Sequence, residues 1–405
     1  MQVPTDTPAT ATVYIAGSFQ GWDPGSPAHA LAKLPDGRWS ITLDLPDGTP
    51  IAYKFTRGDW GTVEKGPGGE EIADRTHTPN GTQTVDHTVA RWADGNASTI
   101  TGNVTTFTLT PFLNARRVWV YLPPGYDDTD DRYPVLYMHD GQNLFDSATS
   151  FSGEWEVDET CEALIGAGEI EPIIVVGIDN GQNFRISEYT PWPDPQYGGG
   201  NGDNYLAALR DVLIPEIDSR YRTRADAAHR YMSGSSLGGL ISAYAAYTHP
   251  DTWSRVACLS SSYWWDDTHM LTYATGAGRS GGFVRFYQDH GTNESGGLDH
   301  LATMRSIALS QGFIEGLDFL SVIGAGHQHN EAAWAERMPD ALRFLVDAPC
   351  FPDCNDDDAL NIDDIDCYVT AFLAGDLAAA DCDANGALNV DDIDCFVAAF
   401  LGGCP

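Results

Sequence analysis

Residues 231–240 read YMSGSSLGGL, an extended apolar run that meets small residues and then continues as a helical pattern. The flanking residues agree with this, since 230–232 have strand character and 241–247 have helix character. Gly234 and Gly238 allow a strand and the next helix to approach closely around Ser236. The pattern predicts a nucleophile elbow and acyl transfer through a covalent ester on Ser236, and a simple turn of small residues is the alternative.

Apolar strands alternate with helical patterns between residues 104 and 348. The expected strands are 134–139, 173–178, 256–260, 283–287 and 317–323. Alternation of this kind is typical of an α/β domain with a largely parallel sheet. The elbow serine would then stand at the carboxyl edge of that sheet, where loops carry the rest of an active site.

A serine nucleophile needs a histidine base and an acid that orients it, and in elbow enzymes these follow the serine in the order acid, then histidine. The segment QDHGTNESGG after strand 283–287 offers Asp289 and Glu294 as acids. The segment GAGHQHNEAAW after strand 317–323 offers His327 and His329 as bases. Chain order by itself leaves both alternatives open.

These segments resemble esterases of the esterase D type, which include feruloyl, acetylxylan and enterochelin esterases with an α/β-hydrolase fold. The matching stretches are YPVLYMHDGQNLFD at 133–146, the elbow, GTNE at 291–294 and HNEAAW at 329–334. The resemblance implies His329 as the base and Glu294 as the acid, with His327 and Asp289 as the alternatives. It also implies an oxyanion hole from the backbone N–H groups of Leu237 and Gln142.

Other residues near this edge have expected supporting roles. Asp140 is expected to hold the Gln142 loop in shape, and RISEY at 185–189 is expected to form an ion pair that fixes its own loop. Trp264 and Trp265 follow the strand 256–260, where they would flank an acyl or sugar group or pack in the core. No cofactor is expected for catalysis.

Residues 1–93 contain short alternating runs separated by Asp-Gly and Pro-Gly turns, which predicts a β-sandwich, and 94–103 read as a linker. The text AGSFQGWDP at 16–24 and DGRWSITLDLPDG at 36–48 resembles starch- and glycogen-binding modules. The resemblance implies that Trp22 stacks on a sugar. The second sugar-contacting position falls on Lys65, with Trp60 five residues earlier.

Residues 349–405 contain a repeat with a period of 28 residues, DCNDDDALNIDD at 353–364 and DCDANGALNVDD at 381–392. Oxygen side chains stand at loop positions 1, 3, 5, 9 and 12, as in calcium loops. The candidate ligands are Asp353, Asn355, Asp357, Asn361, Asp364, Asp381, Asp383, Asn385, Asn389 and Asp392. The duplicated loop and helix resemble a dockerin, which implies up to two calcium ions and a cohesin-type scaffold partner. Six cysteines lie here and allow 15 pairings.

The net charge of −36 excludes nucleic acid and anionic membranes as expected partners, and no apolar run is long enough for a membrane span. The N-terminal residues do not read as a signal peptide, yet the cysteine density favours an exported protein. The sequence therefore predicts a secreted, multidomain serine carboxylesterase acting on feruloyl or acetyl esters of plant polysaccharide. The alternatives are a siderophore-lactone or aryl esterase, an acyltransferase, and a non-catalytic glycan-binding scaffold.

Overall fold

The computed structural model describes residues 1–5, 7–8, 10–67, 69–95, 98–150, 153–346, 354, 361–375, 380 and 388–402. Its internal contacts divide the chain into two units. One comprises Met1–Ala163 with Pro172–Leu345, and the other comprises Leu164–Glu171 with Val346–Pro405. The predicted boundaries at residues 93, 103 and 348 stay predictions.

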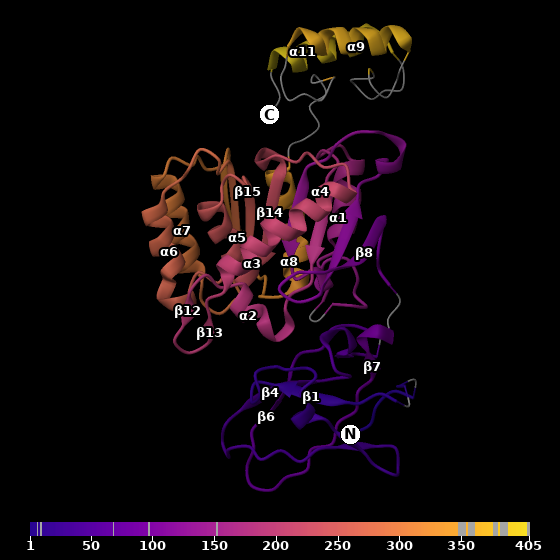
Figure 1. Ribbon diagram of the computed structural model, residues 1–405, viewed down its shortest axis with the longest axis vertical. Coiled ribbons are helices and arrows are strands. Elements are labelled where there is room, and N and C mark those ends of the chain that lie inside the picture. Colours follow the sequence, from indigo (N-terminus) through magenta and orange to yellow (C-terminus); the bar gives the residue numbers. More distant parts are fainter. Residues whose placement is uncertain are drawn as a thin grey trace. The chain divides into compact units, whose positions relative to one another are not determined.

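An eight-stranded sheet forms the centre of the first unit (Figure 1). Its strands, in spatial order, are β17 (Phe319–Gly324), β16 (Arg285–Gly291), β15 (Arg255–Leu259), β14 (Arg230–Ser235), β10 (Val135–His139), β11 (Ile174–Ile178), β9 (Arg116–Leu122) and β8 (Asn103–Leu109). The six strands from β17 to β11 are parallel, and β9 and β8 are antiparallel additions at one edge. The predicted α/β domain with a largely parallel sheet is confirmed. Every residue of β10 and β11 is buried, as expected for central parallel strands covered on both faces.

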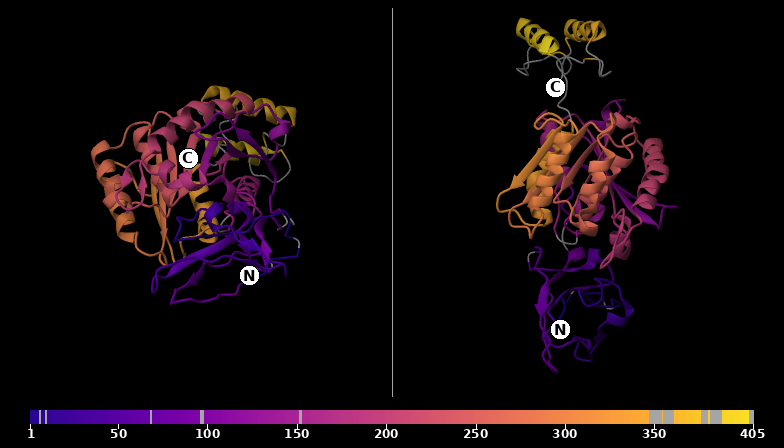
Figure 2. Two further views of the ribbon diagram at one scale, coloured as in Figure 1. Left: turned by 60° about the horizontal axis from the view of Figure 1, so that its bottom comes forward. Right: turned by 90° about the vertical axis from the view of Figure 1, so that its left-hand side faces the viewer.

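Helices cover both faces of this sheet (Figure 2). The helices between and after its strands are α1 (Val157–Gly166), α2 (Arg185–Glu188), α3 (Gly202–Ala208), α4 (Ile214–Arg220), α5 (Leu237–Thr248), α6 (Trp265–Ala277), α7 (Leu298–Ser310) and α8 (Glu331–Leu345). Helix α5 packs on β14 and β15 and is buried from Leu237 to Tyr247, which explains why its sequence is apolar on nearly all sides. The loops at the carboxyl ends of β10, β14, β15, β16 and β17 therefore meet at one edge of the sheet.

The first 93 residues form smaller sheets. Strands β1 (Tyr14–Gly17), β4 (Ile51–Thr56) and β6 (Arg75–His77) make a three-stranded antiparallel sheet. Strand β2 (Ala32–Lys33) pairs with β3 (Trp39–Ser40), and β5 (Glu64–Lys65) pairs with β7 (Arg91–Trp92). In the alternating run at residues 39–45, which predicts a strand, only Trp39 and Ser40 form one. The packing of a complete β-sandwich stays a prediction.

The described part of the C-terminal repeat contains two helices, α9 (Ile362–Ala374) and α11 (Val390–Gly402). One helix follows each predicted calcium loop, and the rings of Tyr368 and Phe396 stack with centroids 3.9 Å apart. Cys354 and Cys367 form a disulfide, which settles one of the open cysteine pairings.

Four of the ten candidate calcium ligands lie in the described part of this repeat. Asn361 caps α9 in a capping box with Asp364. In the second repeat, Asp392 Oδ2 accepts the N–H of Asn389 at 2.8 Å. Asp353, Asn355, Asp357, Asp381, Asp383 and Asn385 lie outside the described residues. The calcium loops therefore stay predictions. Within the described ranges, no helix combines the length and apolarity needed to cross a membrane.

Candidate active site

Ser236 stands between β14 and α5 in the strained backbone of an elbow. Its φ and ψ are 57° and −120°, a conformation that L-residues rarely adopt. Gly234 is required beside it, because a Cβ there would lie 2.8 Å from the Gly238 carbonyl carbon and from His139 Cδ2. The Ser236 side chain is partly exposed at the N-terminus of α5, as a nucleophile that must meet a substrate requires.

His329 and Glu294 form a pair in the loops after β17 and β16. His329 Nδ1 lies 2.7 Å from Glu294 Oε2. The Glu294 side chain is 2% exposed, whereas the His329 side chain is 43% exposed and meets Trp334 edge to face. A buried carboxylate that holds one imidazole nitrogen leaves the other nitrogen free to act as a base.

Several donors stabilise the Glu294 carboxylate. Glu294 Oε1 accepts from Ser260 Oγ at 2.6 Å and from the Gly291 N–H at 2.7 Å. Burial acts to raise the pKa of Glu294, but the hydrogen bonds from His329, Ser260 and Gly291 outweigh it and lower the pKa to about 2. Glu294 is therefore ionised at neutral pH, as an acid that orients a histidine must be.

The Ser236 hydroxyl contacts Ser262, whereas in a closed catalytic triad it would contact the histidine. Ser236 Oγ lies 3.2 Å from Ser262 Oγ, and across the described residues no hydrogen bond joins Ser236 to His329. Such contacts commonly tighten only when a substrate binds. The structure brings the three expected residues to one sheet edge, with the His329–Glu294 contact formed.

The two expected oxyanion donors are placed by the elbow and by the turn after β10. Leu237 begins α5, and Gln142 lies in the short 3-10 turn Gly141–Asn143. No acceptor in the described chain takes either N–H. Both are therefore available to an oxyanion.

An ion pair fixes the turn that carries Gln142. Asp140 has φ 58°, and its carboxylate receives Arg185 Nε and Nη2, each at 2.7 Å. The expected role of Asp140 in shaping this loop agrees with these contacts. The expectation of an ion pair within 185–189 is corrected, because Arg185 pairs with Asp140 and Glu188 pairs with Arg116 at 2.9 Å.

The alternative acid, Asp289, has other partners. Asp289 and His290 belong to β16 and are buried, so the expectation that they lie in the loop after the strand is corrected. Asp289 Oδ1 accepts from the Ser260 N–H at 2.9 Å. Asp289 Oδ2 lies 2.9 Å from Arg337 Nε, an ion pair without the alignment of a hydrogen bond.

The alternative base, His327, also points elsewhere. Its Nδ1 lies 3.0 Å from Arg337 Nη1, and its Nε2 lies 3.1 Å from the exposed carboxylate of Glu336. The described contacts of His327 include neither Glu294 nor Ser236.

Two supporting residues were not foreseen from the sequence. Ser260 donates to Glu294 and accepts from Trp334 Nε1 and Arg337 Nη2, each at 2.9 Å. Arg337 lies in α8, is 3% exposed, and also lies 3.7 Å from Glu294. The sequence itself shows only an arginine eight residues after His329, within the helical pattern that follows the histidine.

The aromatic candidates separate into buried and exposed residues. Trp265 is 2% exposed and donates to the Trp192 carbonyl at 2.7 Å, which favours core packing over substrate contact, the two roles expected for it. Trp264 is 45% exposed, and its ring centroid lies 5.8 Å from that of Tyr197.

In the N-terminal region the structure pairs Trp22 with Trp60, whose ring centroids are 6.2 Å apart. Lys65 is buried at 2% exposure and pairs with Glu71 at 2.7 Å. The expectation for Lys65 is corrected, because its side chain is not exposed as a sugar contact requires. Trp60 occupies the place beside Trp22 instead.

Comparison with known proteins finds a family match over the α/β region of the chain. The family model Esterase, described as "Putative esterase", matches residues 112–345, more than half of the chain. A serine hydrolase structure from Shewanella oneidensis, described as IroE-like, superposes with a TM-score of 0.53 at 21% identity and covers 74% of this chain and 99% of its own, which supports the fold.

Two curated relatives match shorter stretches. An endo-1,4-beta-xylanase/feruloyl esterase of Xylanibacter ruminicola is 32% identical over 149 residues, which is 35% of this chain and 19% of the relative. An alpha-amylase of Niallia circulans is 50% identical over 95 residues, which is 23% of this chain and 7% of the relative. The chain thus spans only a small part of either relative. On the family match and the fold, the chain belongs to the Esterase family.

Proposed function

We propose that the protein is a serine carboxylesterase. His329 takes the proton of Ser236 as Oγ attacks the ester carbonyl carbon, and the N–H groups of Leu237 and Gln142 stabilise the oxyanion. The protonated His329 then gives its proton to the leaving alcohol as the C–O bond breaks. Water, deprotonated by His329, attacks the acyl-serine and releases the acid and Ser236.

The observation that carries this proposal is the 2.7 Å contact between His329 and the buried Glu294 carboxylate, at the same sheet edge as the strained Ser236. A surface ion pair would not need two further donors on the same carboxylate. Ser260 and the Gly291 N–H both donate to it, and the Arg337 guanidinium lies 3.7 Å away. A buried carboxylate held by several hydrogen bonds beside a histidine is typical of a positioned catalytic acid.

The proposed substrate is a feruloyl or acetyl ester on plant polysaccharide. Support comes from the relative named as a xylanase/feruloyl esterase. Support also comes from the exposed Trp264 and Tyr197, since flat aromatic faces suit both phenolic acyl groups and sugar rings.

Hydrolysis assays test the proposal. The substrates are p-nitrophenyl acetate, methyl ferulate, acetylated xylan and feruloylated xylan, with Ser236→Ala beside the wild type. We expect Ser236→Ala to lose at least 10³-fold in kcat. Ser262→Ala is the matched control, since it removes a hydroxyl 3.2 Å from the nucleophile and should cost less than tenfold. Equal activity of Ser236→Ala and wild type would overturn the assignment.

We further propose that Trp22 and Trp60 form a sugar-stacking face. Their rings lie side by side and both side chains are partly exposed. Affinity electrophoresis in starch and in xylan tests this, with Trp60→Ala against Trp39→Phe as a buried control. If Trp60→Ala were slowed in the polysaccharide gel as much as the wild type, Trp22 and Trp60 would not form a sugar-stacking face.

For the C-terminal repeat we propose calcium loops, a cohesin-type partner and an exported protein. The support is the repeated loop pattern, the helix after each loop and the disulfide Cys354–Cys367. Ile362 and Val390, at the start of the two helices, are each 64% exposed and would face the partner. Calcium-dependent retention on an immobilised cohesin, lost in an Ile362→Asp/Val390→Asp variant, tests it.

A further inference from the structure

Three carboxylates crowd together around the start of α1, outside the proposed active site. They belong to Glu154, Asp158 and Glu159, and one oxygen from each lies within 4.8 Å of the other two. Asp158 is fully buried, and the other two are partly buried.

One oxygen of each carboxylate is held by the short segment before β8. Thr99 Oγ1 donates to Glu154 Oε2 at 2.7 Å, and the Thr101 N–H donates to Asp158 Oδ2 at 2.7 Å. Thr101 Oγ1 donates to Glu159 Oε1 at 3.3 Å. These bonds fix three carboxylates from the loop and helix around the segment 99–101.

The other oxygen of each carboxylate has no hydrogen-bond partner. Glu154 Oε1, Asp158 Oδ1 and Glu159 Oε2 are all buried and unpaired. Within the chain that the structure describes, none of the three residues forms an ion pair with a lysine or arginine. The unpaired oxygen of the fully buried Asp158 is the observation that points to a missing ligand, because a buried carboxylate normally has its acceptors satisfied.

The helix dipole of α1 does not compensate for the burial and mutual repulsion of these carboxylates. Asp158 and Glu159 stand in the first turn of α1, where the helix dipole stabilises an acid only modestly. The loss of hydration on burying a carboxylate is much larger. Burial raises the pKa of both Asp158 and Glu154, which means that the site disfavours uncompensated negative charge. A positive ion among the three oxygens would remove the repulsion.

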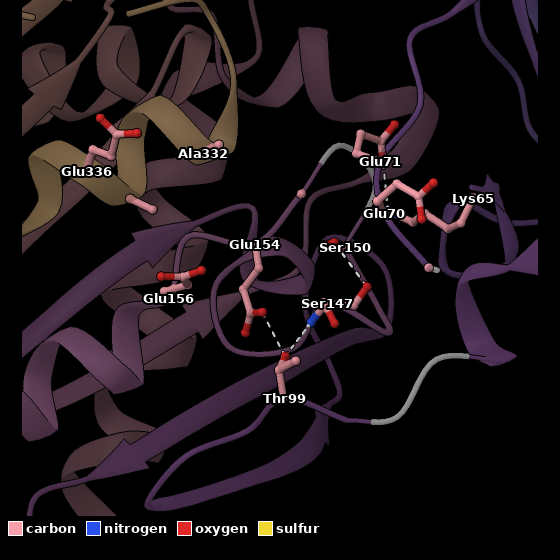
Figure 3. A pocket seen from close by; sticks show the side chains of 13 residues that line it. Lys65, Glu70, Glu71, Thr99, Ser147, Ser150, Glu154, Glu156, Ala332 and Glu336 are labelled. Atoms are coloured by element: carbon pink, nitrogen blue, oxygen red, sulfur yellow. Dashed lines mark hydrogen bonds and ion pairs between the residues drawn. The ribbon is translucent and has the colours of Figure 1, made fainter. Parts of the chain in front are cut away.

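We propose that Glu154, Asp158 and Glu159 bind one divalent cation of the oxygen-preferring class, with calcium as the ion of choice. Carboxylates are the ligands this class prefers, and calcium accepts irregular oxygen sets completed by water. One of the three proposed ligands, Glu154, lines a cavity of about 560 Å³, together with Thr99 and Glu156. Figure 3 shows the Thr99–Glu154 hydrogen bond at its wall.

The ion would fasten the segment 99–101, and hence the start of β8, to α1. It would act on stability rather than on chemistry, because none of its ligands belongs to the proposed active site. It is also independent of the calcium loops proposed for the C-terminal repeat, since its ligands lie in a different unit of the chain.

Calcium titration of the full chain by isothermal calorimetry, after treatment with EDTA and at pH 7.5, tests the site. We expect Asp158→Asn to bind one ion fewer per chain than the wild type, with the remaining sites unchanged. Glu156→Gln is the matched control, because it removes the same charge from an exposed neighbour and should keep every ion. A double variant of the repeat, Asp364→Asn/Asp392→Asn, should retain the ion at Asp158, so failure of the repeat's loops and failure of this site are separable.

Thermal unfolding gives a second readout. In EDTA, Asp158→Asn should melt at or above the temperature of the wild type, because repulsion is relieved. In calcium, only the wild type and Glu156→Gln should show a higher melting temperature from the ion at this site. The comparison is made in the Asp364→Asn/Asp392→Asn variant, so that calcium bound by the repeat does not contribute. If Asp158→Asn does not fold, Glu159→Gln replaces it with the same expectations. An equal number of ions bound by wild type and Asp158→Asn, or equal stabilisation by calcium, would overturn the proposal in favour of carboxylates that share protons.

Discussion

Replacing Glu294 with glutamine tests how the buried carboxylate controls His329. The amide oxygen can keep the bonds from Ser260 and the Gly291 N–H, which leaves the amide nitrogen facing His329 Nδ1. A donor at that position favours the tautomer with the proton on Nε2. His329 would then be unable to accept the proton of Ser236.

The size of the effect follows from these contacts. A wrong tautomer in an intact triad costs about 10³–10⁴ in kcat, or about 4–5 kcal/mol of transition-state stabilisation. The free energy of unfolding falls as well. The pKa of Glu294 is lowered from 4.5 to about 2, which corresponds to about 3 kcal/mol of interaction in the folded state, of which the amide keeps a part.

Steady-state hydrolysis of p-nitrophenyl acetate measures the loss, with circular dichroism as the check on folding. Glu336→Gln is the matched control, because Glu336 is an exposed carboxylate that contacts the other loop histidine, His327. We expect Glu336→Gln to keep wild-type kcat. If folded Glu294→Gln kept a kcat within threefold of wild type while Asp289→Asn lost most of its kcat, the catalytic acid would be Asp289 and not Glu294.

Three further outcomes are expected. Gly234→Ala should lower the free energy of unfolding by about 1–3 kcal/mol and reduce esterase activity, because its Cβ would lie 2.8 Å from Gly238 backbone; an unchanged urea midpoint and activity would contradict this. Arg337→Met should cost about 3–5 kcal/mol in guanidinium unfolding, since it leaves the fully buried Asp289 without its cation, and a loss under 1 kcal/mol would show that the pair is not needed. The depressed pKa of Glu294 means that its stabilisation is complete above pH 4.5 and disappears as the pH falls through about 2, so unfolding midpoints of wild type and Glu294→Gln should converge across that window rather than stay parallel.

Local patterns were enough to predict the centre of the fold. The run before Ser236 and the helix after it became β14 and α5 with the expected turn between them. The expected strands 134–139 and 173–178 lie within one residue of β10 and β11. These elements are buried on both faces, so their apolar runs and bounding loops appear directly in the sequence.

Contacts between distant segments could not be predicted in the same way. Arg185 pairs with Asp140 across 45 residues rather than with Glu188 on its own turn, because the end of β10 lies beside that turn only in the folded sheet. Arg337 reaches Asp289 for the same reason. The sequence predicts a loop at Asp289 because the apolar stretch ends before it. In the structure β16 continues past that stretch to Gly291.

The most direct test of the central claim is covalent labelling of the nucleophile. The full chain is treated with a fluorophosphonate, which phosphonylates activated serines and expels fluoride, and the product is mapped by peptide mass spectrometry. We expect one adduct per chain, on the peptide that contains Ser236, and none in Ser236→Ala. Label on another residue, or no label on a protein that hydrolyses p-nitrophenyl acetate, would contradict it.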